Sequence, residues 1–441
     1  MTGSARSLSL FPNSLALIGS KVSAMGLGFL FWVLAARLFD AEQVGLAAGV
    51  IAAMMLCTQI ALFGLGSAVI ALLPAELRSP RALLDSAFSL VTVLALVTGL
   101  GFLVVAALAL GELNVISGSI VYGLLFVAAT VTGTLGILLD QLSTSLRRGD
   151  QALVRGIAFG LAALLSLAAL AGSGATGSQA LLVPWVIGGV VALAIGVVQV
   201  RRALAGYVPR PAVIRSRARR LVGTGMPNFA LTLAERSPGL ILPIVVTELL
   251  SPASNAVWYA AWMMAWVAFI VPIQVGMTLF AEIAHDPGSL AAATRRATRA
   301  ALLVGVPVAA AIALLAHPLL SLLGNEYADA GVGPLRILVL GLIPLTFVQV
   351  YYASCRGVGR LGEAIAAAWA TGLIGICAAA AAGVGSGLEA MALAWVAVQL
   401  GAALFAAARL GRLRRRLVAA PGAQPAAMEA PARFATGAAA G

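Results

Sequence analysis

The sequence predicts an all-α polytopic membrane protein with about twelve transmembrane helices in two parallel six-helix bundles. Three observations predict this fold: the composition, the length of the apolar runs and the positions of the basic residues. Of the 441 residues, 61% are hydrophobic and only 10% are charged, and the mean hydropathy is +1.03. Because a soluble globular chain carries roughly 25% charged residues, most of the surface of this chain must face lipid rather than water.

The apolar runs are long enough to cross a bilayer. A hydrocarbon core of about 30 Å requires a helix of about 20 predominantly apolar residues, and the runs between the polar clusters meet that length. The first run lacks a small-residue cleavage site, which favours a retained span over a signal peptide. We expect spans at 14–38, 44–73, 83–110, 115–140, 151–172, 180–200, 221–248, 254–283, 295–322, 333–355, 361–383 and 388–410.

The basic residues predict the orientation of these spans. They cluster in alternate connections, most densely at 201–220, whereas the opposite connections carry acids such as Asp40 and Glu326. Because cytoplasmic loops of membrane proteins are enriched in Lys and Arg, both termini are expected in the cytoplasm. Residues 1–13 would form the cytoplasmic N-terminus, and residues 411–441, rich in Ala and Pro, a disordered cytoplasmic tail.

The basic linker at 201–220 divides the chain into two bundles, 14–200 and 221–410, each with six expected spans. An even number of spans returns the chain to its starting side, so the two bundles should have parallel orientation. An internal repeat supports this division. The segment ARLFDAEQVGLAA at 36–48 aligns with TELLSPASNAVWY at 247–259, a shift of 211 residues.

A second alignment supports the same repeat. Gln141 is followed at seven residues by Arg148-Gly149, and Gln349 is followed at seven residues by Arg356-Gly357, a shift of 208 residues. The two alignments occur in the same order and with nearly equal shifts. Together they indicate that the second bundle repeats the first.

The sequence contains no pattern of enzymatic chemistry. The only histidines are His285 and His317, and the chain has neither a phosphate-binding glycine loop nor a GxSxG nucleophile motif. The three cysteines lie within or at the ends of apolar runs, so they indicate neither a disulfide framework nor a metal site. The net charge of +12 comes from arginines at the ends of apolar runs, which argues against a nucleic-acid partner. We therefore expect that the protein is not an enzyme and binds neither a metal nor a cofactor.

Ionisable side chains inside the expected spans are the first candidate site residues, because charge within a bilayer is costly and usually functional. Glu235 and Arg236 lie about fifteen residues into the span at 221–248, and adjacent helical residues do not face each other. At least one of them therefore needs a separate partner, an aqueous cavity or a ligand; structural pairing is the alternative. Lys21 lies roughly 10 Å into the first span, where it could face a cavity or extend to the cytoplasmic headgroups.

The same span is unusual in its backbone. Pro227, Pro238 and Pro243 each remove a helical hydrogen bond and are expected to kink or break the helix. Broken helices at corresponding positions of two halves indicate the binding site of a transporter. The alternative is that neighbouring groups accommodate the prolines, as membrane helices often allow.

Aromatic residues mark one face of the following span. Trp258, Trp262 and Trp266 recur every four residues. We expect Trp258 to belong to an interfacial aromatic belt. Trp266 lies about 12 Å deeper along the helix, where it could stack on a sugar ring or simply pack in the core.

Two arginines lie at the outer ends of their spans. These are Arg37 and Arg336. Arg37 is followed by Asp40 and Glu42, so an ion-paired gate or a solvated turn is expected at Arg37 and Asp40 rather than a binding site.

These segments resemble a known family. ARLFDAEQVG after the first span and AERSPGLILPIVVTELLSPASNAVWYAAW at 234–262 are similar to the polysaccharide biosynthesis proteins that export lipid-linked glycans, whose superfamily also contains multidrug extruders and the lipid II flippase. The family's turn after the first and seventh spans reads Leu-x-Pro/Asp-x-x-x-Gly-x-Tyr. Residues 40–45 and 251–259 correspond to it, with Ala256 in place of the glycine. The family's acidic–basic pair in the seventh span corresponds to Glu235 and Arg236.

The resemblance implies two six-helix bundles that face each other across a central cavity and expose a polyprenyl-diphosphate sugar alternately to the two sides. A cationic cavity suits that ligand because buried arginine pairs with phosphate through charge-assisted hydrogen bonds. We therefore expect a flippase for undecaprenyl-diphosphate-linked oligosaccharide in the bacterial cytoplasmic membrane, serving capsule, O-antigen or exopolysaccharide assembly. The expected substrate contacts are Lys21, Glu235, Arg236 and Trp266. The expected partners are this lipid-linked glycan, membrane lipid and other polysaccharide-assembly proteins.

Three alternatives stay open. The first is a cation-coupled multidrug exporter of the same fold, although this chain lacks the aspartate in the first span that many multidrug extruders use for coupling. The second is a membrane-embedded glycan polymerase or ligase, which would need a large extracytoplasmic loop where every expected outward loop is short. The third is a secondary transporter of another superfamily with six-plus-six architecture.

Overall fold

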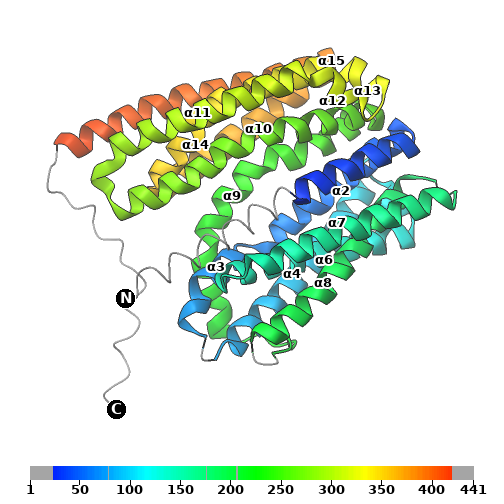
Figure 1. Cartoon of the computed structure of the whole chain (residues 1–441), viewed down its shortest axis with the longest axis horizontal. Helices are drawn as coiled ribbons and strands as arrows, with labels where there is room; N and C mark the ends of the chain where they lie inside the picture. The colour runs from blue at the N-terminus through cyan, green and yellow to red at the C-terminus, as the bar shows by residue number, and fades with distance from the viewer. Residues whose placement is uncertain (1–22, 78, 175, 205–206, 420–441) are drawn as a thin grey trace.

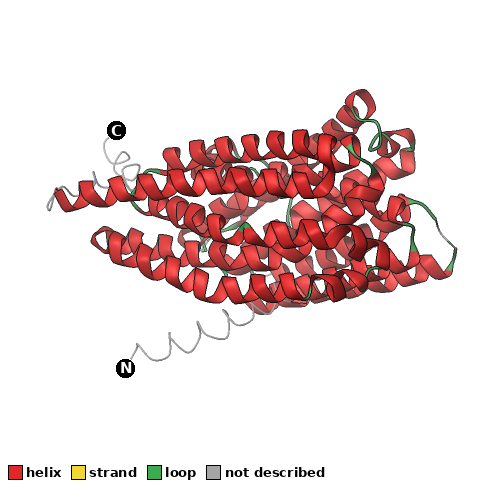
Figure 2. Cartoon of the chain, turned by 90° about the horizontal axis from the view of Figure 1, so that it is seen from above, coloured by secondary structure: helices red, strands yellow, loops and turns green. Residues whose placement is uncertain are grey.

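The computed structural model describes residues 23–77, 79–174, 176–204 and 207–419. Every regular element in these ranges is helical, as Figure 2 shows. The chain begins with the helix Ser23–Leu38 and continues through α2 (Ala41–Leu62), α3 (Leu65–Leu72), η1 (Leu73–Ala75), α4 (Arg81–Ala109), α5 (Val115–Gly118), α6 (Ile120–Ser145), α7 (Gly149–Gly172), α8 (Ser178–Ala203), α9 (Arg215–Leu249), α10 (Pro252–His285), η2 (Pro287–Ser289), α11 (Leu290–Leu314), α12 (Ala316–Ser321), α13 (Asn325–Leu340), α14 (Leu342–Gly357) and α15 (Leu361–Ala419).

The polytopic all-α prediction is confirmed, with differences in where helices begin and end. Within the described ranges, ten helices are long and apolar enough to cross a membrane. The first expected span is described only from Ser23. The expected spans 361–383 and 388–410 are joined in α15, whose backbone leaves the helical region at Gly387 with φ 80° and ψ −168°. These two places account for the difference from twelve.

The helices form two groups, which Figure 1 shows one above the other. The first helix group comprises the helix Ser23–Leu38 and α2 to α8, and the second comprises α10 to α15. α9 contacts both groups and bends as it passes between them (Figure 1). It is one continuous helix of 35 residues, so of the kink or break expected at its three prolines the structure shows a bend and no break. Neighbouring helices accommodate the prolines instead.

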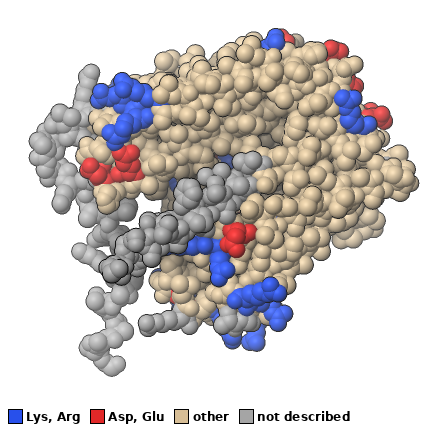
Figure 3. All heavy atoms as spheres, in the orientation of Figure 1, with Lys and Arg blue, Asp and Glu red and all other residues tan. Residues whose placement is uncertain are grey.

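The two ends of the molecule differ in charge. The basic end is the end at which α6 finishes and α9 starts, close to Arg147, Arg148 and Arg215; the acidic end holds Asp40 and Glu326. Figure 3 shows charged side chains gathered toward the margins of one face, with a broad uncharged surface between them. Many large apolar side chains are exposed, among them Leu108, Leu303 and Leu314. In a membrane protein this uncharged surface faces the hydrocarbon core.

At the acidic end, α2 and α10 begin in equivalent ways and pack closely together. Asp40 is the N-cap residue of α2 and Ser251 that of α10, where the Ser251 hydroxyl accepts a hydrogen bond from the Ser254 N–H at 3.0 Å. A Cβ atom on Gly45 would lie 1.7 Å from the Pro252 carbonyl oxygen. The glycine of the turn pattern is therefore required by the close approach of the two helices.

At the basic end, the segment that precedes α9 is held against the first helix group. The Asp85 carboxylate accepts hydrogen bonds from the Tyr207 hydroxyl at 2.6 Å and from the Arg210 N–H at 3.0 Å. Burial and the Asp85 carboxylate raise the pKa of Tyr207, so its hydroxyl stays protonated and donates. Glu76 forms ion pairs with Arg217 and Arg220 at the start of α9. The start of α9 is thereby anchored to the first helix group.

Candidate functional site

A central cavity of about 430 Å³ lies between the two helix groups. The first group contributes α2, α3 and the end of α6, the second group contributes α10, α14 and α15, and α9 crosses the cavity between them. The bend between α2 and α3 shapes one wall, because Gly64 has φ 73° and a Cβ there would lie 2.3 Å from the Gly225 carbonyl oxygen of α9. The polar and aromatic lining residues include Gln59, Ser67, Gln141, Asn228, Thr232, Glu235, Arg236, Trp262, Trp266, Phe269, Gln349, Tyr352, Arg356, Thr371, Trp395 and Gln399.

Arg236 lines this cavity from the middle of α9. Its side chain is exposed although it lies well inside a membrane-spanning helix. Its Nη1 donates one hydrogen bond, to the Oε1 atom of Gln59 on α2 at 3.2 Å. No carboxylate in the described part of the chain lies within the 4.0 Å of an ion pair. The guanidinium therefore keeps most of its donors free for a molecule in the cavity.

Arg356 is a second cation in the same cavity. It is the basic residue in the last turn of α14, and its Nη2 donates to the Oδ1 atom of Asn228 at 3.1 Å. Its guanidinium carbon lies 5.0 Å from the centroid of the Phe280 ring, within the range of a cation–π contact. Like Arg236, it forms no ion pair among the residues described.

Glu235 partly offsets this positive charge. It interacts electrostatically with both Arg356 and Arg236 and hydrogen-bonds to the side chain of Gln349. These three residues are the charged members among the described lining residues, two cations and one anion. The cavity is therefore cationic on balance. Glu235 interacts with Arg356, which is distant in the sequence, as well as with the adjacent Arg236.

An aromatic cluster lies beside these charges. Trp262 and Trp395 approach with ring centroids 5.1 Å apart, and Phe269 lies 5.6 Å from Trp395. Trp266 extends the cluster through Phe269 at 6.4 Å, and it lines the cavity. Trp258 does not form the expected interfacial belt: it is 0% exposed and packs on Trp262, because α10 is central in the molecule. The cavity thus combines a net positive charge with flat apolar rings.

Two predicted residues within the described ranges, Arg37 and Asp40, do not line the cavity. Lys21 lies outside the described residues. Arg37 forms no ion pair with Asp40 or Glu42; its guanidinium instead donates to the carbonyl oxygens of Ser321 and Leu322 in the second helix group. Asp40 lies in the turn before α2 as the N-cap residue, and its side chain makes no capping hydrogen bond.

The sequence does not mark several of the polar lining residues as site residues. Arg356 lies at the end of a span, where a basic residue is normally solvated, and Asn228 and Gln59 carry no charge. Gln141 and Gln349 could have been found, because the repeat aligns them and both line the cavity. Equivalent positions in two facing halves tend to meet at the interface between those halves.

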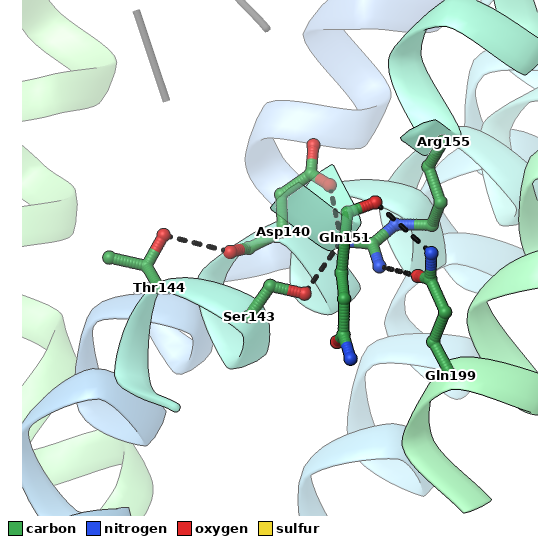
Figure 4. Close-up of polar contacts among 6 residues, drawn as sticks. All are labelled: Asp140, Ser143, Thr144, Gln151, Arg155 and Gln199. Atoms are coloured by element: carbon green, nitrogen blue, oxygen red, sulfur yellow. Dashed lines mark hydrogen bonds and ion pairs between the residues drawn. The ribbon is translucent and has the colours of Figure 1, made fainter. Parts of the chain in front are cut away.

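Arg155 shows how this chain holds an arginine that is structural. It is 3% exposed within α7 and lines a separate cavity of about 320 Å³ in the first helix group. Figure 4 shows its guanidinium between α6 and α8, where Nη2 lies 2.7 Å from the Asp140 carboxylate and 2.9 Å from the Ser143 hydroxyl. Nη1 donates to Gln199. Its charge is therefore neutralised internally, unlike the charges of Arg236 and Arg356.

No cluster suited to a metal ion occurs among the described residues, since no three His, Cys, Asp or Glu side chains converge there. The central cavity presents hydrogen-bond donors, amides and aromatic rings. Such a lining can bind an anionic group and an attached polar ring system.

Comparison with known proteins identifies relatives by family and by fold. The family described as "Polysaccharide biosynthesis protein" matches residues 10–280. No curated protein matches the chain in sequence. Among solved structures, the lipid II flippase MurJ in an inward closed conformation superposes with a TM-score of 0.69 at 14% identity, over 90% of this chain and 87% of that one.

Two further structures share the fold. An inward-facing multidrug resistance MATE transporter of the MOP superfamily has a TM-score of 0.66 and 15% identity, over 90% of this chain and 99% of that one. A MOP superfamily transporter from Pyrococcus furiosus, whose binding pocket is described as having reverse polarity, has a TM-score of 0.65 and 14% identity, over 93% and 96%. These likenesses confirm the predicted fold class.

Proposed function

Because this chain belongs to the polysaccharide biosynthesis protein family, we propose that it is a flippase that translocates undecaprenyl-diphosphate-linked oligosaccharide across the cytoplasmic membrane by alternating access. The oligosaccharide would then be used in cell-surface polysaccharide assembly. The two moving parts are the predicted bundles at 14–200 and 221–410. The observation that carries the proposal is the exposed guanidinium of Arg236, which lies in a cavity between the two helix groups and has no ion-pair partner among the described residues.

The charge of the cavity supports an anionic substrate. A lipid-linked glycan carries a diphosphate, and guanidinium groups bind phosphate oxygens through charge-assisted hydrogen bonds that are often bidentate. Arg236 and Arg356 line the same cavity, and neither has a carboxylate at ion-pair distance in the described part of the chain. We assign the diphosphate to these two residues, with Lys21 as a further contact on the first span. Glu235 would hold Arg356 in place and limit the net charge.

The aromatic cluster supports a sugar as the group next to the diphosphate. Trp266 presents a flat apolar ring at the cavity wall beside Phe269. A sugar ring has an apolar face, which packs on indole. It also has hydroxyl groups, which hydrogen-bond to side-chain amides such as those of Gln349 and Gln399. We therefore assign the first sugars to the region between Trp266 and these amides.

The distribution of basic residues supports an orientation. We place the basic end and both termini in the cytoplasm, according to the enrichment of arginine in cytoplasmic loops. All direct hydrogen bonds that join the first helix group to α10–α15 among the described residues involve the acidic end: Asn255 to Gly45, and Arg37 to Ser321 and Leu322. In this orientation the conformation described is closed on the outer side.

A cation-coupled multidrug exporter of the same fold is the alternative that the cavity argues against. Cationic drugs would be repelled by two arginines that a single glutamate does not neutralise. A glycan polymerase or ligase would need catalytic residues on a large extracytoplasmic loop. The connections at the acidic end within the described ranges are short.

Substitution of Arg236 tests the assignment in cells. We expect Arg236→Ala to abolish export, Arg236→Lys to retain part of it because the charge remains, and Lys21→Ala to have a milder effect. The measurement is the ratio of glycan at the cell surface to lipid-linked precursor inside, at matched protein abundance. Arg296→Ala is the matched control, since Arg296 pairs with Glu282 outside the cavity. Normal export by Arg236→Ala would contradict the cationic-cavity mechanism.

A further inference from the structure

Two charged side chains at the acidic end cross between the halves of the molecule and bind backbone. Arg37, at the end of the helix Ser23–Leu38, donates its Nε–H to the Leu322 carbonyl at 2.9 Å and its Nη2–H to the Ser321 carbonyl at 2.7 Å. Those carbonyls lie at the C-terminal end of α12 in the second helix group. Helix-terminal carbonyls lack intrahelical donors, so a guanidinium satisfies them well.

Glu248, near the end of α9, makes the converse contact. Its carboxylate accepts hydrogen bonds from three successive N–H groups at 111–113, at 2.7, 3.2 and 2.8 Å. This turn joins α4 to α5 in the first helix group. Three backbone donors on one carboxylate form a charge-assisted set of hydrogen bonds, which is stronger than a neutral set.

The two contacts are equivalent in the internal repeat. The alignment of 36–48 with 247–259 places Arg37 at the position of Glu248, and the same shift of 211 residues places Ser321 and Leu322 at 110 and 111. Each half therefore extends a charged side chain from the end of its first span to the turn after the third span of the other half. The signs are opposite, and each sign matches the backbone groups that it meets.

The crossing of α2 and α10 belongs to the same arrangement. Gly45 on α2 approaches the start of α10 so closely that its carbonyl oxygen accepts a buried hydrogen bond from the Asn255 side chain at 2.8 Å. Gly45 and Ala256 are equivalent by the same shift. The helices therefore meet at their symmetry-related positions, and the two charged contacts complete the closure of this end.

We propose that Arg37 and Glu248 form a reciprocal latch that holds the acidic end closed, and that both contacts must break before the cavity can open there. This inference rests on the proposed alternating-access function and adds its gating residues. The latch joins side chain to backbone, so it differs from an ion pair between two gate residues. Exchanging the charges would place a carboxylate against carbonyls and a guanidinium against N–H groups.

Electron paramagnetic resonance distances between spin labels test the latch. The labels replace Gly118 and Asp329, exposed residues of the two helix groups near the acidic end, in a variant without the three native cysteines. The measurement uses purified protein without glycan. We expect Arg37→Ala and Glu248→Ala each to lower the ratio of closed to open molecules by about tenfold, because each removes charge-assisted hydrogen bonds. The open molecules are those with the longer distances between labels. Arg37→Lys and Glu248→Gln, which keep part of each contact, should give intermediate shifts.

Two matched variants separate the latch from a general loss of structure. Arg336→Ala removes an arginine that also binds a carbonyl, that of Ala313 at 3.1 Å, but within the second helix group. Glu112→Gln neutralises a carboxylate in the latch turn itself while leaving its N–H in place. Both should retain the distances of the unmodified protein.

The inference is overturned if Arg37→Ala and Glu248→Ala leave the distances unchanged. It is also overturned if the double exchange Arg37→Glu with Glu248→Arg restores the closed distances, because rescue by exchange indicates a direct ion pair. If the latch variants open the acidic end in a protein that moves no lipid-linked glycan, the latch stands and the proposed function fails. The two hypotheses are therefore distinguishable.

Discussion

At the scale of single residues, the surroundings of an arginine decide what it can do. Arg155 is surrounded by Asp140, Ser143 and Gln199, so its guanidinium joins three helices. Arg236 and Arg356 each donate to one amide oxygen and lack an ion-pair partner among the described residues. The sequence predicts Arg236 because it lies mid-span beside Glu235. It could not predict Arg356, because a residue at the end of a span is normally solvated by headgroups and water.

The second cavity cation gives a prediction at this scale. We expect Arg356→Ala to reduce export at least tenfold, since losing charge-assisted hydrogen bonds to phosphate costs about 1.5–3 kcal/mol. Asn228→Ala should have a smaller effect, because it removes the amide that orients Arg356 but keeps the charge. The ratio of surface glycan to internal lipid-linked precursor measures both. Equal export by Arg356→Ala and the unmodified protein would remove Arg356 from the site.

At the scale of helices, the hydropathy pattern predicts where the helices lie but not where the backbone turns. In the described part of the chain each expected span corresponds mainly to helix, because a long apolar run has no other stable form across a bilayer. The positions of turns between and within helices are harder to predict. Three prolines leave α9 continuous, whereas the chain turns between α2 and α3 at Phe63 and Gly64 without a proline. Such turns depend on the approach of another helix, here at Gly225, and a single sequence does not contain that information.

The crossing of α2 and α10 gives a prediction at this scale. Gly45→Ala should lower the thermal midpoint of the purified protein, because its Cβ would lie 1.7 Å from the Pro252 oxygen and overpacking of this kind costs about 1–3 kcal/mol. Gly101→Ala is the control, since a Cβ there meets nothing within 4 Å. Both substitutions remove a helical glycine, so only the packing differs. Equal midpoints for the two variants would contradict the close crossing.

At the scale of the whole molecule, the internal repeat connects the parts of the account. Its first alignment contains Gly45, Arg37 and their equivalents, which together close the acidic end. Its second alignment contains Gln141 and Gln349, which both line the cavity. The sequence therefore predicts equivalent positions that lie where the two halves face each other. It could not predict their contacts, because Arg37 binds backbone carbonyls rather than the nearby acids that its sequence context favours.

The central claim is that the cavity moves a lipid-linked glycan across a bilayer. The most direct measurement reconstitutes the purified protein in vesicles that contain undecaprenyl-diphosphate-linked oligosaccharide and follows the fraction of glycan that an external, impermeant glycosidase can digest. We expect the unmodified protein to raise the digested fraction of glycan from about half toward completion. We expect Arg236→Ala to leave it at the level of protein-free vesicles. A fraction that stays at that level with the unmodified protein, or that rises equally with Arg236→Ala, would contradict the account.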